Sequence, residues 1–395
     1  MPKMPRRRFG RTELDMPVFS TGGMRYQHSW EDIDPSEIAA ANQANLEATI
    51  RRSVELGINH IETARGYGTS EIQLGEVLPS FPRDELIVQT KVGPTETVKE
   101  FNATFNVSMG NLKLDHVDLL SLHGINDRQT LDWSLGHCIE AAHKLRRAGR
   151  ARFIGFSTHA PTPLIVEAIN TGAFDYINVH WYWVNDFNWP AILMARQQDM
   201  GIFIISPNDK GGMLYKPTPQ LKRLCAPLSP MQFNDMYCLS RDEVHTLSLG
   251  AAKPSDYDDH IEGLKHYKQR AKISAEISER LHAQMRKKLG ADWYENWAVG
   301  LPEYWDVPGE VNLKEIFRLH NYAVGLGMTE WAAMRYNLLG NAGHWFPGHN
   351  AKKLRKRGWE KCLEKSPFSM ADILDTLREA EDLLGGIEVK RLSES

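Results

Sequence analysis

The sequence is poor in cysteine and lacks long apolar runs. Cys138, Cys225, Cys238 and Cys362 are far apart among its 395 residues, and none belongs to a CxxC pair. This spacing excludes a zinc ribbon and the disulfide framework of a small secreted domain, so we expect reduced thiols. No stretch of about 18 apolar residues occurs, and the basic amino terminus is not followed by an apolar run of signal-peptide length. We therefore expect a soluble, cytoplasmic protein without a membrane partner.

Charge of one sign is not in excess either. The chain has 47 Lys and Arg against 50 Asp and Glu, a formal net charge of -3. Such a balance supplies no general attraction to nucleic acid, and none is expected as a partner. The densest basic run, Lys352 to Arg357, is most simply a solvated helix face, with a binding site for an acidic partner or nucleic acid as the alternative. The charged fraction of 25% and the hydrophobic fraction of 42% are typical of a globular protein.

What the sequence does contain is a repeated alternation of short β-branched runs and segments with helical periodicity. The predicted strands are Val18–Gly22, Asn59–Glu62, Leu86–Lys91, Val117–His123, Phe153–Ser157, Tyr176–His180, Ile202–Ser206 and His245–Gly250. Between them lie predicted helices at Ala41–Glu55, Ser70–Leu78, Val98–Leu112, Leu131–Arg147, Pro163–Asn170 and Pro190–Met200. The strands follow one another at about the length of a βαβ unit, which predicts a parallel sheet covered by helices on both faces.

The first predicted strand decides between an open and a closed sheet. The residues at its end and directly after it, Ser20 to Met24, do not match the GxGxxG turn of an open nucleotide-binding sheet. The preceding residues, Arg8 to Val18, are typical of a small hairpin that could cover the bottom of a barrel. We therefore predict a closed (β/α)8 barrel over residues 1–264, followed by an all-helical extension over residues 265–395. Lys268–Leu289 and Met370–Leu384 are the clearest helices of that extension.

Four polar side chains follow three consecutive predicted strands, at the end of the barrel where active sites form. Glu62 ends the second strand and Tyr67 follows it, Lys91 ends the third and His123 ends the fourth. A tyrosine, whose pKa is ordinarily about 10, becomes a better proton donor when an adjacent ammonium lowers that pKa. Lys91, anchored by Glu62, would supply the ammonium, and His123 would orient a carbonyl oxygen. Each residue taken singly is also explained as an ordinary charge, turn aromatic or satisfied polar group.

These residues and their neighbours resemble the aldo-keto reductase superfamily in order and spacing. The resemblance rests on Phe9–Thr12, the run from Glu62 to Gly75, Lys91, His123, Gly155–His159 and Gly211–Leu214, and it spans about residues 7–264. It implies a (β/α)8 barrel that binds NADP(H), with Tyr67 as the general acid, Lys91 and Glu62 adjusting its acidity, and His123 orienting the substrate. Ser70 is expected to cap the helix that follows Tyr67.

The resemblance also implies where the cofactor and the substrate would bind. The expected cofactor contacts are Gly23, Met24, Ser157, Thr158, His180, Ser206, Asn208, Lys210, Gly212, Gly250, Lys253 and Asp259. Arg25, Trp30 and Trp181 are expected to line a substrate pocket suited to a planar or anionic carbonyl compound. Lys253 favours NADP(H) over NAD(H), while the adjacent acids Asp258 and Asp259 weaken that preference.

Several positions depart from the family pattern. The family has Asp where this chain has Glu62, Asn where it has Thr158, and usually a Gln on the sixth strand, for which His180 is the best match. A subgroup of the family carries a helical carboxyl-terminal extension that binds [4Fe-4S] clusters through cysteines, and residues 265–395 are similar to that extension. Cys362 alone remains of such a motif, and a cluster needs about four thiolates, so no iron–sulfur cluster is expected. The extension is then either a packed relic over the barrel rim or a docking surface for a protein partner.

The resulting prediction is an NADP(H)-dependent oxidoreductase that reduces or oxidises a small carbonyl or alcohol by hydride transfer, with Tyr67 exchanging the proton. The alternative is a cofactor-binding barrel with little turnover that acts as a regulatory or scaffold protein, as the departures at Glu62 and His180 would permit. Metal-dependent hydrolysis is the weakest interpretation, because no set of His and carboxylate residues with metal-ligand spacing follows the predicted strands, and no metal site is expected.

Overall fold

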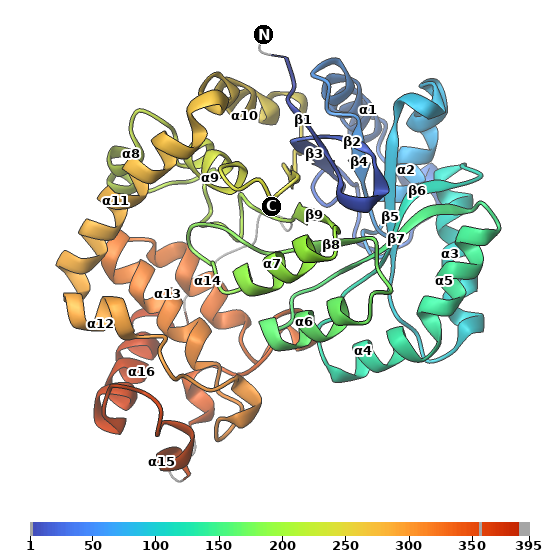
Figure 1. Ribbon diagram of the computed structural model, residues 1–395. Coiled ribbons are helices and arrows are strands. Elements are labelled where there is room, and N and C mark those ends of the chain that lie inside the picture. Colours follow the sequence, from blue (N-terminus) through green and yellow to red (C-terminus); the bar gives the residue numbers. More distant parts are fainter. Residues whose placement is uncertain (1–2, 355–357, 387–395) are drawn as a thin grey trace. The chain divides into compact units, whose positions relative to one another are not determined.

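The computed structural model describes residues 3–354 and 358–386 (Figure 1). Within them, parallel strands close into an eight-membered barrel in the order β10-β3-β4-β5-β6-β7-β8-β9. The barrel strands are β3 Phe19–Gly22, β4 His60–Glu62, β5 Ile87–Val92, β6 Val117–Leu122, β7 Ala151–Ser157, β8 Tyr176–Val179, β9 Gly201–Ile204 and β10 Thr246–Ser248. Each overlaps a strand expected from the sequence, and the predicted (β/α)8 barrel is confirmed.

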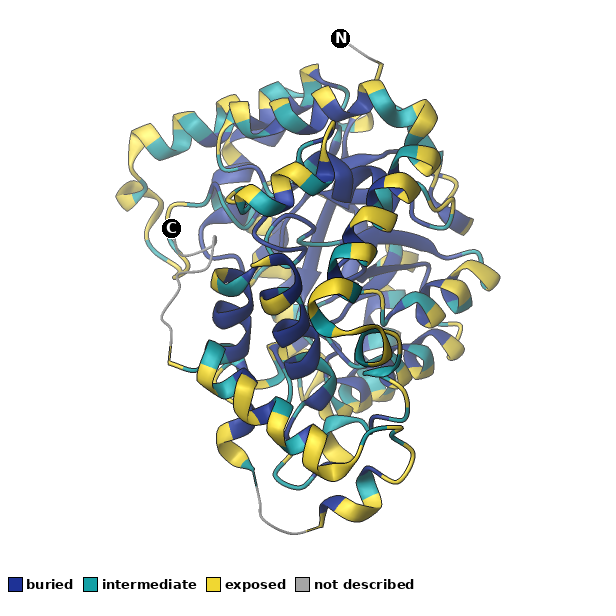
Figure 2. Cartoon of the chain, turned by 90° about the vertical axis from the view of Figure 1, so that its left-hand side faces the viewer, coloured by how far each residue is buried: buried dark blue, intermediate teal, exposed yellow. Residues whose placement is uncertain are grey.

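Helices alternate with the barrel strands along the chain. They are α1 Ala40–Glu55, α2 Ser70–Val77, α3 Val98–Leu112, α4 Arg128–Trp133, α5 Ile139–Arg147, α6 Thr162–Asn170 and α7 Trp189–Gln197, with α8 Pro219–Cys225 and α9 Pro230–Leu239 between β9 and β10, and α10 Asp258–Gly263 after β10. In α1 the buried residues include Leu46, Ile50 and Ser53, which recur every three or four positions and form one face. Figure 2 shows the strands buried along their length and the helices buried mainly on one side.

The helix predicted over Leu131–Arg147 is interrupted. It begins earlier, where the Asp127 side chain accepts a hydrogen bond from the amide of Thr130, and a π-helical turn over Ser134–Cys138 separates α4 from α5. The expectation that Ser70 caps α2 is wrong. Thr69 precedes the helix without a side-chain cap, and the Ser70 hydroxyl lies 2.8 Å from that of Thr63 instead.

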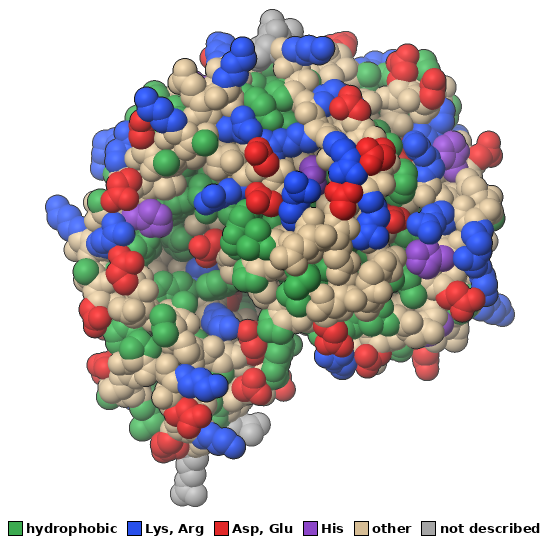
Figure 3. Space-filling view, viewed as in Figure 1, with side chains coloured by type: hydrophobic (Ala, Val, Ile, Leu, Met, Phe, Trp, Pro, Cys, Tyr) green, Lys and Arg blue, Asp and Glu red, His purple; other side chains and the backbone are tan. Residues whose placement is uncertain are grey.

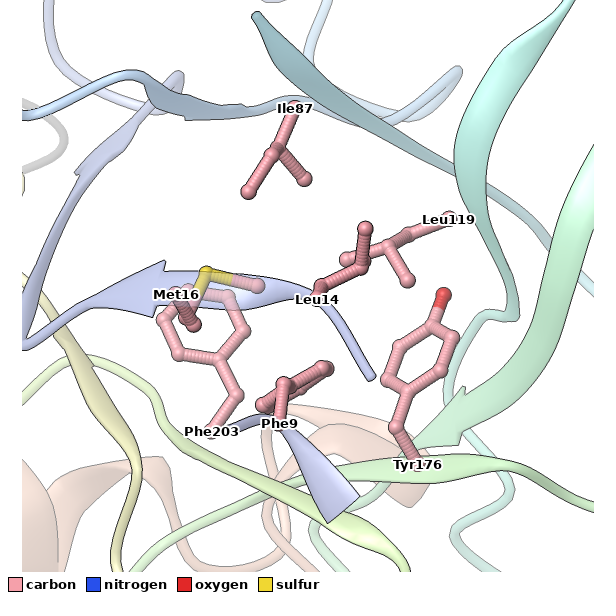
Figure 4. Close-up of a cluster of buried hydrophobic side chains, with 7 residues drawn as sticks. All are labelled: Phe9, Leu14, Met16, Ile87, Leu119, Tyr176 and Phe203. Atoms are coloured by element: carbon pink, nitrogen blue, oxygen red, sulfur yellow. The ribbon is translucent and has the colours of Figure 1, made fainter. Parts of the chain in front are cut away.

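An antiparallel hairpin covers the amino-terminal end of the barrel, as expected. Its strands are β1 Arg6–Arg8 and β2 Asp15–Pro17. Figure 4 shows the cluster that it forms with inward side chains of the barrel strands, made of Phe9, Leu14, Met16, Ile87, Leu119, Tyr176 and Phe203. Because these side chains close that end with apolar surface, polar chemistry is confined to the opposite end, where the strands finish.

Above this cluster the barrel interior is polar and hydrogen-bonded. The hydroxyl of Ser20 lies 2.6 Å from Nδ1 of His60, and Nε2 of His60 lies 3.1 Å from the Gln89 side-chain oxygen. Gln89 donates to Ser121, whose hydroxyl lies 2.9 Å from that of Tyr176. Burial lowers the pKa of His60 to about 3, so its ring is neutral. These bonds satisfy buried polar groups directly beneath the strand ends.

By their contacts the residues fall into two compact units. The first holds Met1–Tyr182, Asp186–Pro207 and Asp235–Arg270, and the second holds Trp183–Asn185, Asn208–Asn234 and Ala271–Ser395. The division into a barrel domain of residues 1–264 and an extension of residues 265–395 stays a prediction. The contacts themselves place two segments from within the barrel sequence, 183–185 and 208–234, in the second unit.

The second unit contains the helical extension. Its helices are α11 Arg270–Leu289, α12 Ala291–Asn296, α13 Leu313–Leu326, α14 Thr329–Leu338, α15 Trp359–Cys362 and α16 Met370–Leu384. The phenol of Tyr336 on α14 donates to Glu381 on α16 at 2.6 Å, and Ser369 caps α16. Among the described residues no helix combines the length and apolar character that a membrane crossing needs. On the face shown in Figure 3, acidic and basic side chains are interspersed.

Candidate active site

The four residues expected to carry chemistry come together at the ends of three neighbouring strands. Glu62 is the last residue of β4 and Lys91 lies near the end of β5, its register partner in β6 being Ser121. The amide of His123, just after β6, donates to Val92 at 2.8 Å and continues the sheet. Tyr67 stands in the turn between β4 and α2. Because parallel strands end at one rim, residues distant in sequence share a small volume.

Lys91 is the centre of this group. Its Nζ forms an ion pair with Oε1 of Glu62 and donates hydrogen bonds of 3.0 Å to the Thr63 carbonyl and 3.0 Å to the Tyr67 hydroxyl. Lys91 is 1% exposed, Glu62 3% and Tyr67 9%. The ammonium therefore has an acceptor for each of its three protons. Thr63, which the sequence did not single out, supplies one of the three through its backbone.

The electrostatics of Tyr67 differ from the sequence-based expectation. Burial raises the pKa of Tyr67 instead of lowering it, because the site withholds water from a phenolate. Burial also lowers the pKa of Lys91, while the contact of its Nζ with the Glu62 carboxylate favours the ammonium. The prediction of an acidic phenol is thus wrong, because burial favours the protonated form of Tyr67 through the neutral range.

Two further aromatic rings frame the phenol. The rings of Tyr67 and His123 lie 5.5 Å apart and nearly perpendicular, and the Trp30 ring lies 6.3 Å from that of Tyr67. Gly68 allows this approach: it has a φ of 51°, and a side chain there would clash with the backbone of Ser29. The glycine after the tyrosine thus lets the loop that carries Trp30 pack against the turn. Trp30 is 42% exposed, which leaves one edge of this cluster open to water.

Several residues expected to contact the cofactor belong to the first unit and lie at the ends of its strands. Gly23 packs so closely that a Cβ would lie 2.7 Å from the Ser70 hydroxyl and 2.9 Å from the Glu62 carbonyl, and Met24 follows it half-buried. The Ser157 hydroxyl accepts from the amide of Gly124 at 3.0 Å, and the Thr158 hydroxyl donates to the Ile125 carbonyl at 2.7 Å. Ser157 and Thr158 therefore tie the end of β7 to the loop after β6.

Asn178 is a polar residue of this region that was not expected from the sequence. It is completely buried on β8 beside its register partner Ser157. Within the described residues, neither its amide oxygen nor its amide nitrogen has a hydrogen-bond partner. Tyr176, two positions earlier, bonds to Ser121 inside the barrel, so Asn178 faces the interior as well. The alternation Tyr176, Asn178, His180 is the signal that could have found it. A buried amide with no partner is costly, which points to a ligand that completes its hydrogen bonds.

His180 and Trp181 are held by neighbouring side chains. Nδ1 of His180 lies 2.5 Å from the Tyr182 hydroxyl, which also donates to the Ile205 carbonyl, and the ring of His159 packs 4.4 Å away. Trp181 is 2% exposed and stacks on Tyr237 at 5.0 Å. The cofactor role of His180 and the pocket role of Trp181 stay predictions, and the packing of Trp181 is that of a core residue.

Residues after β10 meet a residue expected near the substrate. Nη1 of Arg25 donates to the Gly250 carbonyl at 2.9 Å and lies 3.5 Å from the Asp256 carboxylate. That carboxylate also accepts from the amide of Ala252 at 2.9 Å. Arg25 thus contacts the loop that carries Gly250 and Lys253, which ends at α10, where Asp259 lies. The Arg25 guanidinium therefore binds groups of this loop. That Arg25 lines a substrate pocket stays a prediction.

The loop after β9 is divided between the units. Ser206, with a φ of 53°, belongs to the first unit, whereas Asn208, Lys210 and Gly212 belong to the second. The amide of Leu214 donates to the Asn208 carbonyl at 2.8 Å, so residues 208–214 form a compact turn. In the described part of the chain, His, Cys, Asp and Glu form no group of three in a metal-ligating arrangement.

Comparison with known proteins agrees with this architecture. The sequence profile described as the aldo/keto reductase family matches residues 19–232. L-galactose dehydrogenase from Arabidopsis thaliana is 32% identical over 187 residues, which is 44% of this chain and 58% of that protein. Morphine 6-dehydrogenase from Pseudomonas putida is 30% identical over 184 residues, 45% of this chain and 59% of that protein. The chain thus spans less than two thirds of the length of these relatives.

Solved structures share the fold. The holo form of an aldo-keto reductase from Bacillus halodurans matches with a TM-score of 0.59 at 21% identity and covers 70% of this chain and 96% of its own. An aldo-keto reductase from Klebsiella pneumoniae in complex with NADPH matches with a TM-score of 0.52 at 18% identity and covers 70% of this chain and 90% of its own. At sequence identities this low, the likeness shows a shared fold and no more.

Proposed function

The chain belongs to the aldo/keto reductase family, and we propose on that premise that it is an NADP(H)-dependent oxidoreductase acting on a small carbonyl or alcohol substrate. The observation that carries the proposal is the buried contact of 3.0 Å between Lys91 Nζ and the Tyr67 hydroxyl. Such a pair suits proton transfer to and from an oxygen that changes between carbonyl and alcohol. The named relatives L-galactose dehydrogenase and morphine 6-dehydrogenase support this reaction class.

Asn178 supports the fit to a nicotinamide cofactor. A carboxamide group offers one donor and one acceptor, which would complement the side-chain amide of Asn178, and Ser157 is its register partner on β7. Lys253 would bind the 2'-phosphate that distinguishes NADP(H) from NAD(H). When bound, this cofactor supplies the hydride. We propose Asn178 in place of His180 as the principal carboxamide contact, because the Nδ1 of His180 already lies against Tyr182.

The proton step belongs to Tyr67. In the reducing direction its hydroxyl donates a proton to the oxygen of the carbonyl as negative charge develops there. The Lys91 ammonium then faces the phenolate at hydrogen-bond distance and stabilises it. In the oxidising direction the same phenolate takes the proton of the alcohol. The Glu62 carboxylate and the Thr63 carbonyl keep the ammonium in place.

His123 and Trp30 are proposed to bind the substrate. The His123 ring lies edge to face with Tyr67, so an oxygen at the phenol hydroxyl would also be near the imidazole. Trp30 offers an apolar surface on another side of the phenol. A small carbonyl compound with one polar and one apolar end fits this combination.

The experiment that tests the proposal combines NADPH binding with turnover. The purified chain is titrated with NADPH, and oxidation of NADPH is then followed with a panel of aldehydes and ketones. Binding together with oxidation that depends on the carbonyl supports an oxidoreductase. Binding without turnover on any substrate favours the second candidate, a cofactor-binding barrel with a regulatory or scaffold role. The longer acid Glu62, where the family has Asp, is the observation behind that candidate.

A further inference from the structure

Two loops that follow barrel strands are held by the helical extension. Trp183–Asn185 come shortly after β8, and Asn208–Asn234 come shortly after β9. Both segments belong to the second unit, together with residues 271–395. In barrels of this kind the loops after the strands carry the binding and catalytic groups. The contacts that hold these two loops therefore bear on function.

The first loop is bound by helix α13 through hydrogen bonds to its backbone. Nη1 of Arg318 donates to the Val184 carbonyl at 2.8 Å, and the hydroxyl of Tyr322 donates to the Trp183 carbonyl at 3.2 Å. Arg318 is 3% exposed, and Glu315 of the same helix binds its guanidinium on the other side. A buried, charge-assisted hydrogen bond of this kind fixes the position of its acceptor.

The second loop is bound by the end of the same helix. The last carbonyls of a helix have no partner within it, and here they accept from the loop. Nε2 of Gln220 donates to the Gly325 carbonyl at 3.2 Å, and the Thr218 hydroxyl donates to the Leu326 carbonyl at 3.4 Å. Lys216 adds an ion pair of 2.6 Å with Glu330, at the start of α14.

Met328, between α13 and α14, contacts the part of this loop that is expected to bind the cofactor. Gly212 has a φ of 129°, and a Cβ on it would lie 2.5 Å from Cε of Met328. Gly327 turns the chain with a φ of 70° and brings Met328 to this place, where it is 3% exposed. The methionine side chain therefore packs directly over the backbone of Gly212.

We propose that α13 and Met328 set the position of the loop after β9 and so raise the affinity for NADPH, with Met328 as a positioning residue. The inference rests on the proposed function, in which Asn208, Lys210 and Gly212 contact the cofactor. A loop that is ordered before binding loses less conformational freedom on binding, which increases affinity. Met328 packs on the backbone of Gly212, so we expect its loss to weaken cofactor binding and to leave the proton step of Tyr67 unchanged.

The test compares Met328→Ala with Met328→Leu, which keeps the bulk, and with Val324→Ala, at an exposed position of α13. Each variant is measured for its NADPH dissociation constant, for kcat at saturating NADPH, and for hydrogen exchange of residues 208–216 without cofactor. Met328→Ala is expected to raise the dissociation constant on the order of tenfold, to speed exchange in 208–216 and to leave kcat unchanged. Met328→Leu and Val324→Ala are expected to behave like the parent.

Gln220→Ala provides a second test at a half-buried side chain, in case Met328→Ala does not fold. It removes one hydrogen bond to α13 and is expected to raise the dissociation constant by about threefold to tenfold. If the parent chain binds NADPH and the variants have the same dissociation constants and the same hydrogen exchange as the parent, this inference is overturned and the proposed function is not. A kcat that falls while the dissociation constant is unchanged overturns it too. A parent chain that binds no NADPH refutes the proposed function itself.

Discussion

Lys91 Nζ lies 3.0 Å from the Tyr67 hydroxyl, and both side chains are buried where β4 and β5 end. Since an ammonium has no lone pair, the tyrosine oxygen is the acceptor in this bond and its proton stays available to another group. The Tyr67 hydroxyl donates to Oε1 of Glu62 over a long distance of 3.5 Å. A carbonyl oxygen that approached at ordinary hydrogen-bond distance would replace this long contact with a better one.

The ionisation of Tyr67 is the first prediction. Burial raises its pKa above the ordinary value of about 10. Tyrosinate absorbance should therefore show no contribution from Tyr67 below about pH 10, as judged by the difference between the parent and Tyr67→Phe. Because the folded state holds this proton more tightly than the unfolded state, the contribution of Tyr67 to the free energy of unfolding is complete below about pH 10 and is lost as the pH rises further. A tyrosinate signal near neutral pH that is present in the parent and absent from Tyr67→Phe would contradict this prediction and would support the acidic phenol expected from the sequence.

The second prediction is that the charge of Glu62 matters more than the length of its side chain. Lys91 Nζ also donates to the Thr63 carbonyl and to Tyr67, so Glu62→Asp, which keeps the charge, should retain kcat within about threefold. Glu62→Gln removes the charge and leaves a buried ammonium without its counter-ion, which should lower the free energy of unfolding by about 3–5 kcal/mol. Denaturant unfolding and kcat are measured for both variants. Equal losses in the two would show that the site depends on the longer side chain.

Asn178 should affect stability and cofactor binding in opposite directions. Asn178→Leu replaces an amide that lacks partners among the described residues with an apolar side chain of similar size. The free energy of unfolding without cofactor should rise by about 1 kcal/mol, while the NADPH dissociation constant should increase about tenfold. Thermal unfolding and NADPH titration measure the two effects. A loss of stability with unchanged NADPH binding would assign Asn178 to the core and not to a ligand.

The fold could be predicted because its signals are local. The β-branched runs at Ile87–Val92 and Val117–Leu122 are buried strands, and the hairpin around Phe9 covers the barrel as its apolar residues indicate. The grouping of Glu62, Lys91 and Tyr67 was also predictable, since the ends of parallel strands meet at one rim. Where a hydroxyl had several possible partners, as at Ser70, the local rule chose the wrong one.

The remaining features depend on contacts that no local pattern contains. The direction of the Tyr67 pKa depends on how completely other segments cover it, which the order of residues does not show. Asn178 stands out because its side-chain amide has no hydrogen-bond partner among the residues that the structure describes, and such partners can be identified only once the strands are placed in the barrel. Residues 208–234 belong to the second unit because they contact α13, which lies about a hundred residues further along the chain.

The central claim is that Tyr67 delivers the proton, and a single-turnover experiment with Tyr67→Phe tests it most directly. The substitution removes the hydroxyl and keeps the ring that packs against His123 and Trp30. With NADPH bound in advance, oxidation on mixing with a carbonyl substrate should be about 10²- to 10⁴-fold slower than in the parent, at an unchanged NADPH dissociation constant. Oxidation at the parental rate would contradict the account.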